Sequence, residues 1–425
     1  MLDGVNAVTA AERLVIRGGR PLRGRVAVSG SKNAALYALA AGLLTAEPVV
    51  LHRVPAIADT GEMTGLLADL GASVEVDGTD VRIEARALSG TAAPAERVAA
   101  LRASFLVMGP LLGRLGEAAC PPPGGDVIGV RPLDVHLAGF RALGAEVGRE
   151  GGAFVARAAR LRGARVFLDY PSVLGTVNVL FAAVLAEGTT TIVNAAAEPE
   201  VAMACALLEA MGARIAGAGG NTLTIEGVDA LHGAEFTVIP DRIEAGTYLL
   251  AGVATGGDVE VVGAELEHLD SLVSKLREAG AVVEACEGGL RARRGATLEA
   301  VQLQAVPYPG FATDLHAPMA AALTQARGVS IIHERVFENR LLYVGELRAM
   351  GARITTGGQA VMIEGPTPLF GTGVRALDVR AGAAVVIAGL CAEGETVIRD
   401  VVHIDRGYAE LESRLRALGA DVRRA

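Results

Sequence analysis

The segment LLADLGASVEV, residues Leu66–Val76, is the first of six closely similar segments that set the organisation of this chain. Its leucines, spaced three and four residues apart, predict one face of an amphipathic helix, and Gly71 predicts that the helix ends in a left-handed conformation. The alternating residues after the glycine predict a strand. The other copies are FRALGAEV (140–147), LLEAMGARI (207–215), KLREAGAVV (275–283), ELRAMGARI (346–354) and RLRALGADV (414–422). Because successive glycines are 68 to 73 residues apart, six such units fill the chain.

Most units contain a second expected helix upstream of the repeated segment. It is an Ala-rich apolar stretch followed by a turn and a strand, as in AAVLAEGTTTIVN (182–194), AGVATGGDVEVVG (251–263) and AGLCAEGETVIRD (388–400). A helix that is apolar nearly all round should be buried, whereas the repeated helix should expose its charged face. Each unit is therefore a βαβ-type piece with two helices. Such a unit is larger than a solenoid repeat, which is usually about 20–50 residues long.

We predict an α/β protein of two domains, in which three repeated βαβαββ-type units surround buried helices in each domain. Domain I is expected to be discontinuous and to comprise residues 1–31 and 240–425, and domain II to comprise residues 32–239. The chain would cross between the domains near Ser31 and near Pro240. The stretch Gly18–Gly30 would then belong with the C-terminal half.

Composition argues against several classes of function. The formal net charge of −9 does not favour a nucleic-acid or anionic-membrane partner. The four cysteines lie far apart without a CxxC or Cys/His cluster, so we expect no metal, no disulfide scaffold and no cofactor. Residues 1–12 lack the basic and apolar regions of a signal peptide, and the apolar run 381–392 is too short to span a bilayer. We expect a cytoplasmic protein, a monomer or weak homo-oligomer, that acts on small molecules.

A lysine stands directly before the first Ala-rich helix, expected over 34–44. Only two lysines occur among the 39 basic residues of the chain, and one of them is Lys32. Ser29 or Ser31 could cap the helix. Lys32 would then lie at a helix N-terminus, where backbone N–H groups and the helix dipole favour an anion. The alternative is an ordinary surface lysine.

A proline- and glycine-rich segment, residues Pro121–Pro132, predicts a long loop rather than a helix or strand. A loop of this length could be a lid that excludes water from a site. The alternative is a solvated linker.

Five arginines lie in apolar or glycine-rich surroundings, and arginine is the residue that best recognises carboxylates and phosphates in a bidentate manner. They are Arg102, Arg131, Arg340, Arg380 and Arg406. Ion pairs with the neighbouring acids are a rival interpretation; these acids are Glu338, Asp378 and Asp405. In FATDL (311–315), Asp314 could cap a helix, which is the more common role, or act as a general base. Together these patterns indicate an anionic small-molecule site between two domains, but no particular reaction.

Seven motifs, in order along nearly the whole chain, resemble those of the UDP-N-acetylglucosamine 1-carboxyvinyltransferase family. They are SGSKNAAL (29–36), LRAS (101–104), PPGGDVIGVRPLDVH (122–136), FATDL (311–315), VFENR (336–340), DVRAG (378–382) and HIDRGY (403–408). Members of this family are enolpyruvyl transferases of peptidoglycan synthesis. The resemblance implies two inside-out α/β domains, as in the sister enzyme EPSP synthase, whose DKSISHR-type lysine motif is absent here.

The reaction implied by the resemblance joins phosphoenolpyruvate (PEP) to UDP-N-acetylglucosamine. PEP is protonated at its methylene carbon, the sugar 3′-hydroxyl attacks the resulting cation, and the tetrahedral ketal then loses phosphate. Asp314 resembles the group that takes the hydroxyl proton. Lys32, Arg131 and Arg406 resemble the residues that bind the phosphate and carboxylate of PEP. Such a site would stabilise the changing negative charge electrostatically.

Further substrate-binding roles follow from the same resemblance. Arg380 would contact PEP or help to close the domains, and Arg102 and Arg340 would support the anion site. Asn33 resembles a residue hydrogen-bonded near the sugar. The implied contacts of the UDP-sugar are Arg131, Pro132, Leu133, Asp134, Val135, Ser172, Val173 and Val336.

Asp126 departs from the family pattern, because most members carry a cysteine at this position of the lid. That cysteine is associated with proton transfer and is the target of the epoxide fosfomycin, and Cys120 does not take its place. A carboxyl group has a reference pKa of about 4, against about 8.5 for a thiol. Donating a proton at neutral pH would therefore need a raised pKa, which substrate phosphates would favour and Arg131 would oppose. We expect Asp126 to support turnover and to resist alkylation.

Two further departures concern the acceptor. Leu174 replaces a glycine expected in a turn, where it would resist positive φ unless the turn moves to Gly175. Ala197 replaces an expected arginine. These changes leave open a paralogue with a different hydroxyl acceptor. A non-catalytic binding or scaffold protein is a further alternative, but it would be expected to lose the charged residues that are present here.

Overall fold

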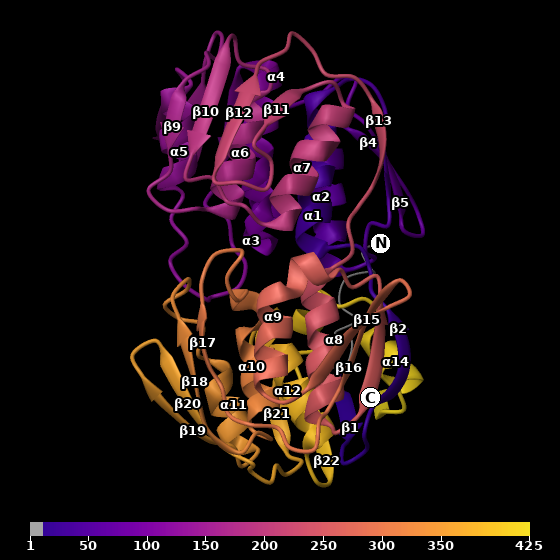
Figure 1. The fold of residues 1–425 in the computed structure, drawn as a ribbon. Helices are drawn as coiled ribbons and strands as arrows, with labels where there is room; N and C mark the ends of the chain where they lie inside the picture. The colour runs from indigo at the N-terminus through magenta and orange to yellow at the C-terminus, as the bar shows by residue number, and fades with distance from the viewer. Residues whose placement is uncertain (1–11) are drawn as a thin grey trace.

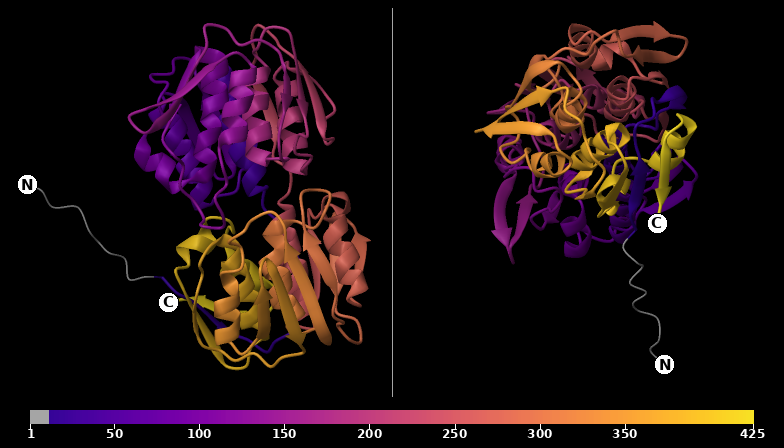
Figure 2. Two further views of the ribbon diagram at one scale, coloured as in Figure 1. Left: turned by 90° about the vertical axis from the view of Figure 1, so that its left-hand side faces the viewer. Right: turned by 90° about the horizontal axis from the view of Figure 1, so that it is seen from below.

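The computed structural model describes residues 12–425. It has two lobes, one built from the middle of the chain and the other from its two ends (Figure 1). Views from the side and from below show the same division (Figure 2). The predicted absence of a signal peptide concerns residues 1–12, nearly all of which lie outside the described range. Within residues 12–425, no helix is long and apolar enough to cross a membrane.

The lobe that contains the C-terminus has three four-stranded sheets. Their orders are β21 (Gly373–Arg375), β22 (Glu395–Arg399), β1 (Leu14–Arg17), β23 (Asp421–Arg424); β15 (Val282–Cys286), β16 (Gly289–Arg293), β14 (Asp258–Val262), β2 (Arg23–Ala27); and β17 (Gln302–Ala305), β18 (Gly328–Glu334), β20 (Ala360–Gly365), β19 (Arg353–Gly357). Three helices, α8 (Arg242–Ala254), α10 (His316–Leu323) and α12 (Val379–Cys391), pack together, and all or nearly all of their residues are buried. The remaining α-helices of this lobe are α9 (Leu266–Glu278), α11 (Tyr343–Ala349), α13 (Val402–Asp405) and α14 (Leu411–Ala417).

The other lobe repeats this plan with two four-stranded sheets and one three-stranded sheet. Their orders are β13 (Ala234–Thr237), β3 (Val49–His52), β5 (Asp80–Glu84), β4 (Ser73–Asp77); β11 (Arg214–Ala216), β12 (Thr222–Glu226), β10 (Thr189–Val193), β9 (Arg165–Phe167); and β6 (Glu117–Cys120), β8 (Ala153–Arg157), β7 (Glu146–Glu150). Its helices are α1 (Lys32–Ala41), α2 (Ala58–Asp69), α3 (Ala95–Ala100), α4 (Met108–Leu115), α5 (Asp134–Ala142), α6 (Val173–Ala183) and α7 (Pro199–Ala210).

The six predicted repeats are confirmed by the helix ends. The repeated segments form the ends of α2, α5, α7, α9, α11 and α14, and a strand follows each of them. The glycines at 71, 144, 212, 280, 351 and 419 have φ between 87° and 99°. A side chain rarely adopts this left-handed conformation, which explains why glycine stands at all six positions.

Two separate hydrophobic cores stabilise the lobes. One consists of residues from 14–26 and 243–422, and the other of residues from 34–238. Strand β2 pairs in parallel with β14, so Gly18–Gly30 belongs with the C-terminal half as the sequence predicts. The exact domain boundaries at 31 and 240 stay a prediction, which this division of the cores supports.

The chain crosses between the lobes at two adjacent points. The Ser31 nitrogen donates to the Ile239 carbonyl (2.7 Å), and the Asp241 nitrogen donates to the Ser29 carbonyl (2.9 Å). The Asp241 side chain caps α8 by accepting from the backbone nitrogens of its first turn, and it also accepts from the Lys32 nitrogen (2.8 Å). The start of α1 in one lobe is therefore fixed to the start of α8 in the other.

Candidate active site

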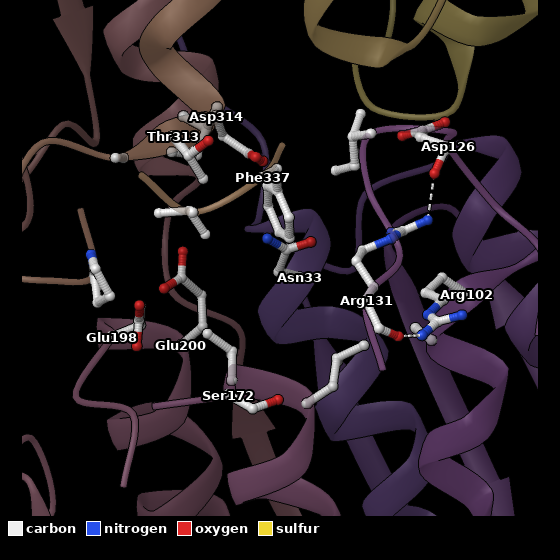
Figure 3. A pocket seen from close by; sticks show the side chains of 18 of the residues that line it. Asn33, Arg102, Asp126, Arg131, Ser172, Glu198, Glu200, Thr313, Asp314 and Phe337 are labelled. Carbon is white, nitrogen blue, oxygen red and sulfur yellow. Dashed lines mark hydrogen bonds between the residues drawn. The ribbon is translucent and has the colours of Figure 1, made fainter. Parts of the chain in front are cut away.

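A cavity of about 600 Å³ lies between the lobes and is lined by both. Figure 3 shows arginines and Asp126 on one side of it and two glutamates on the other. Most of the predicted site residues line the cavity: Lys32, Asn33, Arg102, Asp126, Arg131, Pro132, Ser172, Val173, Asp314, Val336, Arg340, Arg380 and Arg406. Three do not, and they are Leu133, Asp134 and Val135 at the start of α5. Val135 is buried, with 3% of its surface exposed.

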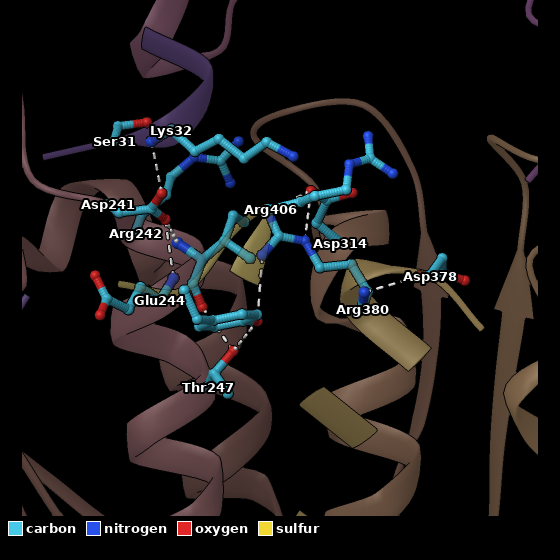
Figure 4. A network of polar contacts seen from close by, with 12 residues as sticks. Ser31, Lys32, Asp241, Arg242, Glu244, Thr247, Asp314, Asp378, Arg380 and Arg406 are labelled. Carbon is cyan, nitrogen blue, oxygen red and sulfur yellow. Dashed lines mark hydrogen bonds and ion pairs between the residues drawn. The ribbon is translucent and has the colours of Figure 1, made fainter. Parts of the chain in front are cut away.

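Lys32 is buried in the site rather than exposed on the surface, so the surface-lysine alternative is wrong. Its side chain has 10% of its surface exposed, and its Nζ lies 2.7 Å from Asp59 Oδ2. Ser31, rather than Ser29, caps α1 by accepting from the Ala34 nitrogen. The cap and the Asp241 contact place Lys32 at the cavity end of the helix (Figure 4).

Asp59 is a site residue that the sequence analysis missed. It accepts from Lys32 and also from Arg406, whose Nε lies 2.8 Å from Asp59 Oδ1. Burial opposes ionisation of this carboxyl group, but the positive charges of Lys32 and Arg406 outweigh it and lower its pKa. No motif marked Asp59, because an acid in the first turn of a helix is a common feature.

Arg406 joins the lobes through two carboxylates. It is paired with Asp59 and with Asp126 of the lid. Burial alone would lower the pKa of Arg406, but these two acids raise it. The rival pairing with the adjacent Asp405 is wrong, because Asp405 is paired with Arg424.

Asp314 lies between two buried arginines. Its Oδ1 is 2.8 Å from Arg340 and its Oδ2 is 2.9 Å from Arg380. Burial would raise the pKa of Asp314, but the arginines hold it far below the usual value. The helix-capping role expected for Asp314 is wrong, since no side chain caps the turn that contains it or helix α10.

The two other acids that were considered as ion-pair partners of the arginines, Asp378 and Glu338, accept hydrogen bonds from backbone nitrogens instead. Asp378 caps α12 by accepting from the Arg380 and Ala381 nitrogens, at 2.7 and 2.9 Å. Glu338 accepts from the Val130 nitrogen of the lid at 2.7 Å. The rival ion pairs of Arg380 and Arg340 with these neighbours are therefore wrong.

The segment 121–132 is a loop, as predicted, and it lies over the cavity as a lid. Arg102 supports it from below by donating to the Pro123 carbonyl (3.2 Å) and to the Arg131 carbonyl. Arg131 has φ of 44° and donates to the Asp126 carbonyl. Burial lowers the pKa of Arg131, and its Nε is buried without a hydrogen-bond partner among residues 12–425. A buried donor without a protein partner requires an acceptor from water or from a ligand.

The opposite end of the cavity is acidic, which the sequence analysis did not anticipate. Arg242 of α8 donates to both oxygens of Glu200 of α7, at 2.9 and 3.2 Å. Glu198 Oε2 is buried without a partner among the described residues, and burial raises the pKa of this carboxyl group. The nearby Ala197, where an arginine was expected, offers no charge to pair with it.

Leu174 lies in the first turn of α6 rather than in a turn that needs positive φ. Ser172 caps this helix by accepting from the Gly175 nitrogen at 3.1 Å. Neither Leu174 nor Gly175 has positive φ, so both the strained turn and the shifted turn are wrong. Leu174 instead lines the cavity, as Ser172 does.

No cluster of three or more His, Cys, Asp or Glu side chains within residues 12–425 could hold a metal ion. The cationic end of the cavity is suited instead to an anionic ligand, because its Lys32 and Arg406 are neutralised only by carboxylates that a ligand could replace.

The chain is similar to known proteins over nearly its whole length. The family described as EPSP synthase (3-phosphoshikimate 1-carboxyvinyltransferase) matches residues 16–415. A protein of Caldanaerobacter subterraneus subsp. tengcongensis named UDP-N-acetylglucosamine 1-carboxyvinyltransferase 1 is 47% identical over 97% of this chain and 99% of its own. The Solibacter usitatus protein named UDP-N-acetylglucosamine 1-carboxyvinyltransferase is 48% identical over the same shares.

Solved structures show the same architecture. The enolpyruvyl transferase NikO from Streptomyces tendae superimposes with a TM-score of 0.87 at 27% identity, covering 98% of this chain and 99% of that one. EPSP synthase from Acinetobacter baumannii gives 0.75 at 18% identity, covering 98% and 100%. The latter likeness concerns the fold alone.

Proposed function

The chain belongs to the EPSP synthase (3-phosphoshikimate 1-carboxyvinyltransferase) family, and we propose that it transfers the enolpyruvyl group of PEP to the 3′-hydroxyl of UDP-N-acetylglucosamine. Relatives named for this transfer are 46–48% identical over 97% of the chain. The protein is accordingly a transferase that releases phosphate in the first committed step of peptidoglycan synthesis. The structural observation that best supports this reaction is the buried cationic end of the interlobe cavity.

PEP would bind at that cationic end. Lys32, Arg131 and Arg406 would hold its phosphate and carboxylate groups, and the unpartnered Nε of Arg131 would find its acceptor there. The ligand would replace the protein carboxylates that now neutralise the cations. Bidentate arginine contacts suit both groups of PEP. Arg102 would act indirectly, by supporting the lid backbone at Arg131.

The transfer would take place in two steps, an addition followed by an elimination. A proton adds to the methylene carbon of PEP, and the sugar 3′-oxygen bonds to the neighbouring carbon while its own proton leaves. The tetrahedral ketal then loses phosphate through cleavage of its C–O bond, and a proton leaves the methyl group to restore the methylene. Asp126 lies on the lid beside Arg406, where it could exchange the proton of the methylene carbon.

Asp314 would accept the hydroxyl proton. Its lowered pKa keeps it ionised, and a carboxylate of low pKa is a weak base. It therefore fits a step in which the proton leaves as the C–O bond to the cationic carbon forms. Arg340 and Arg380 keep the carboxylate in place from both sides. Asn33, Ser172, Val173 and Val336 would line the acceptor.

The partners proposed are the two small-molecule substrates, in a cytoplasmic protein that is a monomer or weak homo-oligomer without a nucleic-acid partner. A different hydroxyl acceptor is the second candidate. It is favoured by one observation, the acidic end of the cavity, where Glu198 Oε2 has no partner among the described residues. A non-catalytic scaffold is disfavoured because the charged side chains gather in one cavity.

Phosphate release tests the proposal directly. Purified protein is incubated with PEP and UDP-N-acetylglucosamine, and shikimate 3-phosphate serves as the control acceptor. We expect release that depends on UDP-N-acetylglucosamine, with Asp314→Asn slower by at least about 100-fold if Asp314 is the base. Release with neither acceptor from folded protein would reject the proposed reaction and favour the second candidate.

A further inference from the structure

Two neighbouring residues of the C-terminal lobe, Glu338 and Asn339, hold the lid. The Glu338 carboxylate accepts from the Val130 nitrogen at 2.7 Å. The Asn339 backbone nitrogen donates to the Ile128 carbonyl at 3.0 Å, and its side-chain Nδ2 donates to the Val127 carbonyl at 2.8 Å. Three hydrogen bonds from one lobe therefore reach three residues of a loop that belongs to the other.

Apolar contact at the same place is small. Val127 and Val130 are 75% and 79% exposed, whereas Ile128 alone is buried, at 6%. Only one of the three apolar side chains of this part of the lid therefore contributes burial. The lid is therefore attached to the C-terminal lobe mainly through polar contacts, which are the hydrogen bonds from Glu338 and Asn339 and the Asp126–Arg406 ion pair.

The lid also fits its holder closely at Gly129. A Cβ atom at Gly129 would lie 2.6 Å from Glu338 Oε2 and 2.9 Å from its carboxyl carbon. Gly129 does not have positive φ, so an alanine there would meet steric resistance from Glu338 rather than backbone strain. A side chain at position 129 would therefore require the Glu338 carboxylate to move from its present position.

The held segment leads directly into the anion site. Val130 is followed by Arg131, whose φ is 44° and whose buried Nε has no partner among the described residues. At the other end of the segment, Asp126 is paired with Arg406. Fixing Val130 therefore fixes the point from which the Arg131 guanidinium enters the cavity.

We infer that Glu338 and Asn339 are positioning residues that clasp the lid in its closed state and thereby place Arg131 for PEP. This inference deepens the proposed function and rests on it. If closure is needed for PEP to bind, the apparent affinity falls in proportion to the fraction of closed lid. The clasp should therefore act on the KM for PEP more than on kcat.

Hydrogen exchange of the ligand-free protein tests the clasp without any reaction. We expect Glu338→Ala to speed exchange in the peptide containing Val130 by about tenfold, because the Val130 N–H loses its acceptor. Glu338→Gln keeps a side-chain oxygen and should retain most of the protection. Glu287→Ala, on an exposed turn of the same lobe, is the matched control and should change nothing at the lid. Unchanged exchange at Val130 in Glu338→Ala would overturn the inference.

Kinetics then test the positioning of Arg131. Glu338→Ala should raise the KM for PEP up to about tenfold, the effect of one lost hydrogen bond to a charged acceptor, and leave kcat within about twofold. Glu338→Gln should restore the KM. A lower kcat at constant KM would contradict the inference. If wild-type protein releases no phosphate at all, the proposed function fails, whereas the exchange result still decides whether the clasp exists.

A double-mutant cycle removes the objection that a variant is merely misfolded. Gly129→Ala should displace the Glu338 carboxylate and thereby weaken its hydrogen bond to the Val130 nitrogen in the wild-type background. The same change should have little further effect in Glu338→Ala, where that carboxylate is gone. Equal effects of Gly129→Ala in both backgrounds would show that Glu338 does not hold the lid.

Discussion

Asp126 is the residue at which the chemistry of the lid differs most from the expected pattern. Its carboxylate is paired with Arg406, and the nearest cysteine in sequence, Cys120, is buried in strand β6. Burial raises the pKa of the Cys120 thiol to about 12, so it is not a reactive thiolate. We predict that fosfomycin leaves the wild-type activity unchanged and that Asp126→Cys becomes sensitive to it. Intact mass and residual phosphate release measure both.

Asp126→Asn is the control for this comparison, since it removes the charge without adding a thiol. It should stay resistant to the epoxide whatever its activity. A stoichiometric adduct on the wild-type protein would show that another nucleophile is present in the site.

Glu244 should make stability depend on pH. It lies at the crossover, where it accepts from the Ser29 nitrogen (2.8 Å) and pairs with Arg414. Burial raises its pKa to about 7, from 4.5. A raised carboxyl pKa means that the folded state binds the proton more tightly, so this group costs stability as pH rises from about 4.5 to about 7, and the full cost remains above pH 7.

The variant Glu244→Gln isolates this effect. The stability of Glu244→Gln relative to wild type should increase by about 3 kcal/mol between pH 4.5 and pH 7 and then level off. Denaturant unfolding at a series of pH values measures it. A pH-independent difference would mean that Glu244 has the same pKa in the folded and the unfolded protein.

Single residues also show where sequence reasoning reaches its limit. Lys32 and the arginines were recognisable because their charge is unusual in an apolar or glycine-rich setting. Asp59 and Glu198 were not, since distant segments of the chain form their surroundings: Asp59 meets Arg406, 347 positions further on. The sequence indicated Lys32, five arginines, Asp126 and Asp314, but not Asp59, which neutralises both Lys32 and Arg406.

Among the elements, the repeat glycines allow a matched comparison. Gly71 and Gly144 are equivalent helix ends with φ of 99° and 93°. A Cβ at Gly71 would lie 2.6 Å from the Ser89 nitrogen, whereas one at Gly144 would meet nothing within 4 Å. We predict that Gly144→Ala costs about 1–2 kcal/mol from backbone strain alone, and that Gly71→Ala costs more because it also displaces backbone.

Urea unfolding followed by circular dichroism measures this pair of variants. Both substitutions act in the same lobe and at the same kind of helix end, so the difference between them reports the steric contact. Equal losses of stability would show that the segment at Ser89 moves away without cost.

The elements were predicted well where the pattern is local. Leucine spacing and a glycine fix a helix end within about one turn of chain, and the six repeats were readable for this reason. Leu174 was misjudged because the sequence PSVLGT is compatible with a turn or with a capped helix start. In the structure Ser172 accepts from the Gly175 nitrogen, and this cap decides for the helix start.

At the scale of the whole molecule, the lobes are joined by polar contacts rather than by a shared core. The two hydrophobic cores are separate, and the cavity lies between them. Charged pairs span the gap at two places, Arg406 with Asp59 and Arg242 with Glu200. An interface held by ion pairs can open when a ligand competes for the charges, which suits a site that must admit two substrates.

The Arg242–Glu200 pair should contribute most of the interface stability that does not change when substrates bind. Its side chains are 11% and 3% exposed, and no substrate anion is expected to compete for it at the acidic end of the cavity. Removing one partner of a buried pair leaves an uncompensated charge, whereas replacing both removes the charge altogether. We therefore predict that Arg242→Met costs about 3–5 kcal/mol and that Arg242→Met with Glu200→Gln recovers most of it. Unfolding of the two single variants and the double variant measures the coupling energy between Arg242 and Glu200. If the effects of the single substitutions simply added, the two side chains would not stabilise each other, and the prediction would be wrong.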